Sequence, residues 1–272
     1  MYVKTLNGLS LNGAWKMQIS LYAGWIAGAG LLYCFAGSGL LLHTSLLVTI
    51  YLLSGVSVIL YTLINKKDNF RLIPRINISV ETFLLAFSMA LALVLVKDAM
   101  GYLLPLPAWP ELSFTSIHAG SGYRIVVSVM LAAFMEEMLF RGIIMEALMK
   151  RYSGGVALLQ SSLLFMLAHP DPAQMPGAFL LGLLTGLFYL RLRDLCACFL
   201  IHLTNNVATA LLLSAGTFQF MNGSPVMYMT IVSGCVAVLC AGYFMIRRLS
   251  PVTPLLQQQA EKAARKRVLL TK

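Results

Sequence analysis

The sequence predicts an all-α fold, a polytopic membrane bundle of about eight transmembrane helices, from its composition, its long apolar runs and the placement of its basic residues. Hydrophobic residues make up 59% of the 272 residues and charged residues only 11%. The mean hydropathy is +0.80, far above that of an ordinary soluble domain. Such a chain belongs in a lipid bilayer.

The apolar runs set the number of spans. Residues 17–65 contain no Asp, Glu, Lys or Arg, which is enough for two spans of about 20 residues each, with a natural break at Gly37, Ser38 and Gly39. The fifth span is short, so a re-entrant or broken helix is an alternative there. After the first two, the predicted spans cover residues 80–104, 123–149, 156–168, 177–190, 195–215 and 226–246.

Connections that contain basic residues alternate with connections that contain few or none. The connections after spans one, five and seven contain no Lys or Arg, and the third has only Lys97 and Arg124 at its edges. Because cytoplasmic loops are enriched in Lys and Arg, both termini are predicted to be cytoplasmic. The basic positions precede span one and follow spans two, four, six and eight: Lys4, Lys16, Lys66, Lys67, Arg71, Arg75, Lys150, Arg151, Arg191, Arg193, Arg247 and Arg248.

We expect a transmembrane domain over residues 1–248, with a motif-bearing core at about 120–215, and a basic cytoplasmic tail at 249–272. The tail either contacts anionic lipid or is simply solvated. The net charge is +10, but the basic residues form short clusters without a nucleic-acid motif. The partners predicted are therefore the lipid bilayer and a membrane-associated substrate, with no nucleic acid, and the location is the cell (inner) membrane.

Two adjacent carboxylates, Glu136 and Glu137, lie deep within the fourth span. A carboxylate at mid-bilayer costs at least about 2.5 to 3.5 kcal/mol, so the pair requires a reason. One is a structural ion pair, because Glu137 and Arg141 are four residues apart on one helix face. Glu136 then points about 100° around the helix, toward another helix, and is the candidate functional carboxylate.

Two further polar groups lie in neighbouring spans. His169 precedes Pro170, which disfavours helical geometry and places the imidazole at a helix end. His202 and Asn206 are four residues apart, so both face one side of the seventh span. Each has a structural alternative, as an interfacial histidine or a helix–helix hydrogen bond.

Depth in the bilayer connects these groups. At about 1.5 Å per residue, Glu136 lies roughly 13 Å from the inner edge of the apolar core, His202 roughly 10 Å, Asn206 roughly 16 Å and His169 roughly 20 Å. Independent structural bonds have no reason to share one layer. The sequence therefore predicts one polar site built from three helices.

Three motifs carry a family resemblance. Glu136, Glu137 and Arg141 form E-E-x-x-x-R, Phe165 and His169 form F-x-x-x-H, and His202 and Asn206 form H-x-x-x-N. In order and spacing the chain resembles the CAAX-protease and bacteriocin-processing (CPBP or Abi) family of intramembrane glutamic endopeptidases. The resemblance covers about residues 120–215.

The resemblance implies peptide hydrolysis by water and a glutamate, without a metal, another cofactor or a covalent intermediate. In that mechanism Glu136 is the general base and His169 shares the proton or orients the water. His202 and the Asn206 amide stabilise the developing oxyanion, while Arg141 holds Glu137.

The same residues also allow other functions. Glu136, His169 and His202 form a possible zinc ligand set, although the sequence has no H-E-x-x-H. A proton-coupled transporter also uses intramembrane carboxylates and histidines, but the inverted repeats of such transporters are not found. A catalytically inactive immunity or binding protein on the same fold is a third alternative. The substrate stays open between prenylated C-terminal tails and leader peptides or sorting signals.

Overall fold

The computed structural model describes residues 9–36, 44–65, 78–108, 122–214 and 223–248, and this part of the chain is helical without strands. The eight predicted helices are confirmed within a few residues at each end. The proposed break at 37–39 and the basic tail at 249–272 lie outside the described residues. The helices are α1 (Leu11–Ala36), α3 (Thr44–Asn65), α4 (Val80–Leu103), the continuous run α6 (Gly122–Glu137), η2 (Met138–Met145) and α7 (Glu146–Met149), then α8 (Gly154–Leu167), α9 (Met175–Leu192), α10 (Leu195–Ser214) and α12 (Pro225–Arg248).

By length and composition, four helices of the described chain are able to cross a membrane: α4, α9, α10 and α12. Shorter apolar stretches of 10–17 residues lie in α3 and α8. The run from α6 to α7 is divided because η2 is a π-helix of 8 residues. Sequence periodicity predicts an uninterrupted α-helix there, and the π-helix is the main local departure from that prediction.

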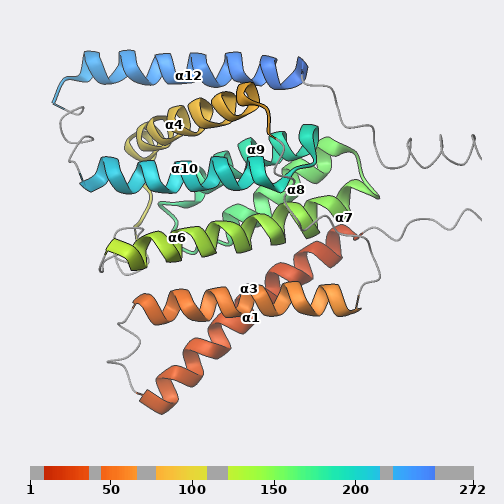
Figure 1. The fold of residues 1–272 in the computed structure, drawn as a ribbon. Coiled ribbons are helices and arrows are strands. Elements are labelled where there is room, and N and C mark those ends of the chain that lie inside the picture. Colours follow the sequence, from red (N-terminus) through yellow and green to blue (C-terminus); the bar gives the residue numbers. More distant parts are fainter. Residues whose placement is uncertain (1–8, 37–43, 66–77, 109–121, 215–222, 249–272) are drawn as a thin grey trace, which may run out of the picture.

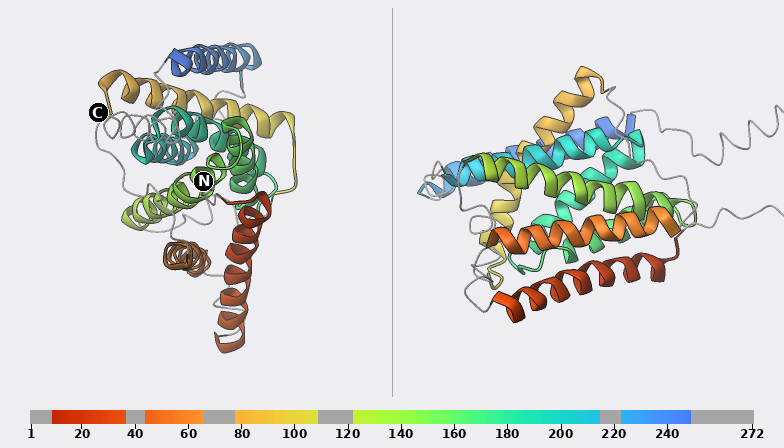
Figure 2. Two further views of the ribbon diagram at one scale, coloured as in Figure 1. Left: turned by 90° about the vertical axis from the view of Figure 1, so that its right-hand side faces the viewer. Right: turned by 60° about the horizontal axis from the view of Figure 1, so that its bottom comes forward.

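The helices form layers that place the motif-bearing elements inside the bundle (Figure 1). On one side α12 covers α4, which packs on α9 and α10; on the other side α1 covers α3, which packs on α6. Successive helices alternate in direction, so α1 begins and α12 ends at the end of the bundle where α7 lies. The two further views show the same order of layers (Figure 2).

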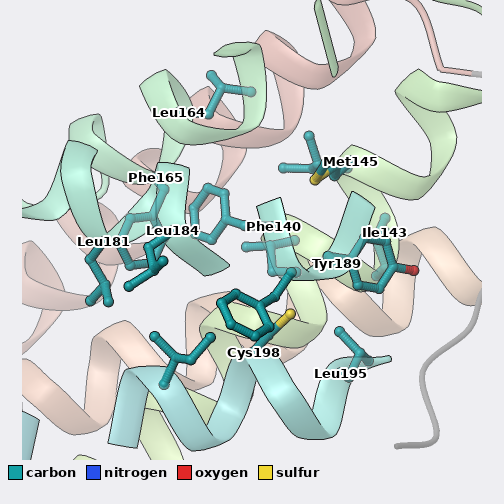
Figure 3. Packing of buried hydrophobic residues seen from close by; sticks show 14 of the residues in the cluster. Phe140, Ile143, Met145, Leu164, Phe165, Leu181, Leu184, Tyr189, Leu195 and Cys198 are labelled. Carbon is teal, nitrogen blue, oxygen red and sulfur yellow. The ribbon is translucent and has the colours of Figure 1, made fainter. Parts of the chain in front are cut away.

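Close packing of α8 and α9 forms the centre of the core. Ser153 begins α8 by accepting a hydrogen bond from the amide of Val156, and the helix ends before His169 and Pro170, as predicted. On α9, Gly182 lies so close to α8 that an added Cβ would be 3.1 Å from Cα of Ser162. The buried side chains of the core cluster include Phe140, Phe165, Leu184 and Cys198 (Figure 3).

We predict that Gly182→Val destabilises the protein, because its side chain would meet the α8 backbone and force two packed helices apart. Overpacking of this kind costs about 1 to 3 kcal/mol, measurable as a lower Tm in detergent. The matched control is Gly234→Ala on α12, where no atom lies within 4 Å of an added Cβ. An unchanged Tm for Gly182→Val would contradict the tight α8–α9 contact.

Candidate active site

The two glutamates lie at the last two positions of α6, immediately before the π-helix. Glu136 is 6% exposed and Glu137 is 1% exposed. A π-helix is rare and is found mostly as a single widened turn, frequently at functional sites. Here it widens the turns directly after the carboxylates, and the hydroxyl of Ser161 on α8 donates to the carbonyl of Phe140 within it at 2.9 Å.

Glu137 contacts a cationic group on one side and an imidazole on the other. Its Oε2 lies 3.2 Å from Nε of Arg141, which confirms the ion pair predicted from the spacing. Its Oε1 lies 2.8 Å from Nδ1 of His202 on α10. The ion pair with Arg141 lies within the fourth predicted span, and the hydrogen bond with His202 connects that span to the seventh.

Arg141 is fully buried, and its contacts reach α8 and α9. Its Nη2 donates to the carbonyl oxygen of Gly182 at 3.1 Å. Its guanidinium lies over the ring of Phe165, 4.4 Å from the centroid, a cation–π contact. Phe165 in turn contacts the rings of His169 and His202, with centroids 4.9 and 5.5 Å away. The Phe of the second motif is therefore the apolar centre of the site.

Glu136 has different surroundings from Glu137. The hydroxyl of Tyr51 on α3 donates to its Oε1 at 3.1 Å, and Nε2 of His202 lies 3.7 Å from its Oε2, beyond hydrogen-bond distance. Glu136 thus points away from Arg141 toward another helix, as helical phase predicts. Tyr51 was not among the predicted site residues, because a tyrosine in an apolar span carries no sequence signal of its own.

His169 lies at the end of α8 beside the same aromatic ring. Its Nδ1 is 3.0 Å from the carbonyl oxygen of Phe165, one turn earlier. Glu136, His202 and Lys97 are the charged or titratable groups that act on it electrostatically. The structure therefore brings all three motifs to one region.

Asn206 lies one turn after His202. Its side chain is hydrogen-bonded to that of the preceding residue, Asn205. Nδ2 of Asn205 donates to Oδ1 of Asn206 at 3.0 Å, and Nζ of Lys97 on α4 donates to Oδ1 of Asn205 at 3.0 Å. Asn205 and Lys97 were missed by sequence analysis. Lys97 lies inside α4, within the predicted span 80–104, although the pattern of basic residues counts it at the edge of the third connection.

Another buried carboxylate lies further along the same helical run. Glu146 is 1% exposed and accepts from the hydroxyl of Tyr189 at 2.9 Å and from Nη1 of Arg193 at 2.5 Å. The sequence singled out only Glu136 and Glu137 as deep acids. Glu146 escaped notice because it lies near the end of the predicted span.

Among the residues described, no group of three or more His, Cys, Asp or Glu side chains is arranged to hold a metal ion. In particular Glu136, His169 and His202 do not converge as a ligand set.

Comparison with known proteins bears on the region that forms this site. Residues 119–208 match the family model described as type II CAAX prenyl endopeptidase Rce1-like. This segment is Rce1-like. It covers about a third of the chain and includes all three motifs, so the resemblance inferred from them is confirmed for this region. No curated protein and no solved structure matches the chain. The matched segment is similar to membrane enzymes of the CAAX-protease type, and the apolar helices around it indicate a membrane protein.

We predict that Arg141→Met lowers the free energy of unfolding by about 3 to 5 kcal/mol, because it leaves the buried Glu137 without its cation. The measurement is thermal unfolding in detergent. The double variant Glu137→Gln with Arg141→Met removes the orphaned charge and should recover part of the loss. A wild-type Tm for Arg141→Met would show that the ion pair contributes little.

Proposed function

We propose that this protein is an intramembrane glutamic endopeptidase, which hydrolyses a peptide bond in a membrane-associated protein or peptide with a water molecule activated by Glu136. The observation that carries the proposal is the unequal pairing of the two glutamates. Glu137 forms an ion pair with Arg141 and a hydrogen bond with His202. Among the described residues Glu136 accepts one hydrogen bond, from the phenol of Tyr51, and faces His202 at 3.7 Å.

Glu137 acts as a positioning residue. As a carboxylate it only accepts hydrogen bonds, so Nδ1 of His202 carries the proton in their 2.8 Å contact. This hydrogen bond fixes the tautomer and the orientation of the His202 ring, as a carboxylate does when it accepts the N–H of a metal-bound histidine. Nε2 of His202 then faces Glu136. Arg141, 3.2 Å from the other carboxylate oxygen, holds Glu137 in place.

Glu136 acts as the general base. It takes a proton from water while the water oxygen attacks the scissile carbonyl carbon, and the carbonyl oxygen becomes an oxyanion. The same proton is then delivered to the departing amide nitrogen as the C–N bond breaks, which returns Glu136 to its ionised form. His169, which lies within electrostatic reach of Glu136, orients the water or shares the proton.

The oxyanion is stabilised from α10. The Asn206 amide donates from its nitrogen, because its oxygen is already occupied by Asn205. In its protonated form His202 also donates, from Nε2. Preformed donors aimed at a developing negative charge stabilise it most in a site of low polarity, and His202 is buried.

We predict that Glu136→Gln lowers kcat by about 100- to 10,000-fold, the contribution of a general base. The assay uses a fluorogenic peptide carrying a prenylated cysteine near its C-terminus, together with its unmodified counterpart, and the purified protein in lipid. The matched control is Glu146→Gln, the same change at a buried glutamate of the same helical run. It should keep its kcat even if its Tm falls.

Three results would contradict the proposal. Loss of cleavage in Glu137→Gln with cleavage retained in Glu136→Gln would reverse the roles of the two glutamates. Loss of wild-type activity on chelation, restored by zinc, would favour the metalloprotease alternative. Absence of any cleavage by the wild-type protein would favour a binding or immunity role.

The positions of the basic residues support a cytoplasmic location for both termini. Lys150 and Arg151 follow α7, and Arg247 and Arg248 end α12, at the end of the bundle where α1 begins. We predict that a cysteine added to the tail reacts with an impermeant thiol reagent only after the cells are opened. Labelling of intact cells would reverse the proposed orientation.

A further inference from the structure

Lys97 reaches the candidate active site from α4, outside the region that carries the three motifs. Its side chain runs along the start of α9, where an added Cβ on Gly177 would lie 2.8 Å from Cε of Lys97. Its ammonium group donates to Oδ1 of Asn205 on α10 at 3.0 Å. The absence of a side chain at Gly177 leaves the space that the lysine stem occupies.

The charge of Lys97 is not neutralised by the carboxylate next to it in sequence. Asp98 faces α12 instead, where the hydroxyl of Tyr228 donates to its Oδ2 at 2.9 Å. Within the described part of the chain no ion pair joins Lys97 to a carboxylate. A lysine held inside an apolar span without an acidic partner among the described residues is expensive and is expected to have a functional reason.

Lys97 determines how the side-chain amides of Asn205 and Asn206 are oriented. An ammonium group has three donors and no acceptor, so Asn205 must turn its oxygen toward Lys97. The nitrogen of Asn205 therefore faces Asn206, which must turn its own oxygen toward that nitrogen. Among the described residues, the NH₂ group of Asn206 is therefore the last donor of this hydrogen-bond chain. An N–H donor, and not a carbonyl oxygen, is what a developing oxyanion requires.

We infer that Lys97 is a positioning residue, which acts through Asn205 to hold the Asn206 carboxamide with its NH₂ group toward the scissile carbonyl oxygen. This inference rests on the proposed endopeptidase function and adds a residue to it. Without Lys97 both amides are free to rotate by half a turn, and Asn206 then presents an oxygen that repels the oxyanion. The positive charge also polarises the two hydrogen bonds in sequence, which strengthens the terminal donor.

The experiment is a double-mutant cycle on kcat with the same fluorogenic peptides. Removal of one oxyanion donor costs about 100- to 1,000-fold in kcat, so Asn206→Ala should fall in that range. Lys97→Met should lower kcat by about 10- to 100-fold with little change in KM, because only the orientation of the donor is lost. Added to Asn206→Ala, Lys97→Met should have no further effect, since its target is already gone.

Two variants separate positioning from a general structural role. Lys97→Arg keeps a donor-only cation and should restore most of the lost kcat. Asn205→Asp keeps the acceptor for Lys97 but has no donor for Asn206, so it should lower kcat like Lys97→Met. The matched control is Tyr228→Phe, which removes the neighbouring α4 hydrogen bond to α12 and should leave kcat unchanged.

The outcomes are distinct. A wild-type kcat for Lys97→Met, or an additive loss in the double variant, would overturn the role of Lys97 and leave the endopeptidase function standing. A raised KM with unchanged kcat would also overturn it, and would indicate that Lys97 binds a substrate carboxylate. No cleavage by the wild-type protein would remove the proposed function and the inference together.

Discussion

The contact of Glu137 with both Arg141 and His202 is the interaction on which the site depends. Desolvation of each charged group costs several kcal/mol, and the cost is offset only when the charges are paired in good geometry. Through these contacts Glu137 connects α6 and η2 to α10, while Arg141 reaches the α9 backbone at Gly182. These contacts fix the positions of the α6–η2 run, α9 and α10 relative to one another at the site.

Packing around Phe165 explains why these relative positions are rigid. The ring receives the guanidinium of Arg141 on its face and contacts Phe140, His169 and His202 with its other surfaces. A close-packed interior transmits small displacements, so a shift of α8 would move both imidazoles together. The π-helical turn that follows the glutamates belongs to the same arrangement, because Ser161 on α8 bonds one of its carbonyl groups.

The sequence predicts the helices and the local contacts, whereas contacts between distant residues escape it. Eight apolar runs predict eight helices, and the four-residue spacing predicts the Glu137–Arg141 pair. Both features depend on residues that are close together in the sequence. Tyr51 and Lys97 meet their partners across 85 and 108 residues. Lys97 lies within the predicted span 80–104, but its partner is an amide on another helix, and hydropathy carries no information about such a contact. The π-helix has no recognised pattern in its residues.

Comparison of Glu136 with Glu146 suggests how to tell a catalytic carboxylate from a structural one in this bundle. Both are buried and both lie on one helical run. Glu146 accepts from a tyrosine and is paired with Arg193, so its charge is compensated where it stands. Glu136 also accepts from a tyrosine, but the described residues give it no arginine or lysine, and His202 stands at 3.7 Å. A carboxylate compensated by a permanent cation has little reason to take up a proton. One that faces a titratable imidazole keeps that capacity, which a general base needs.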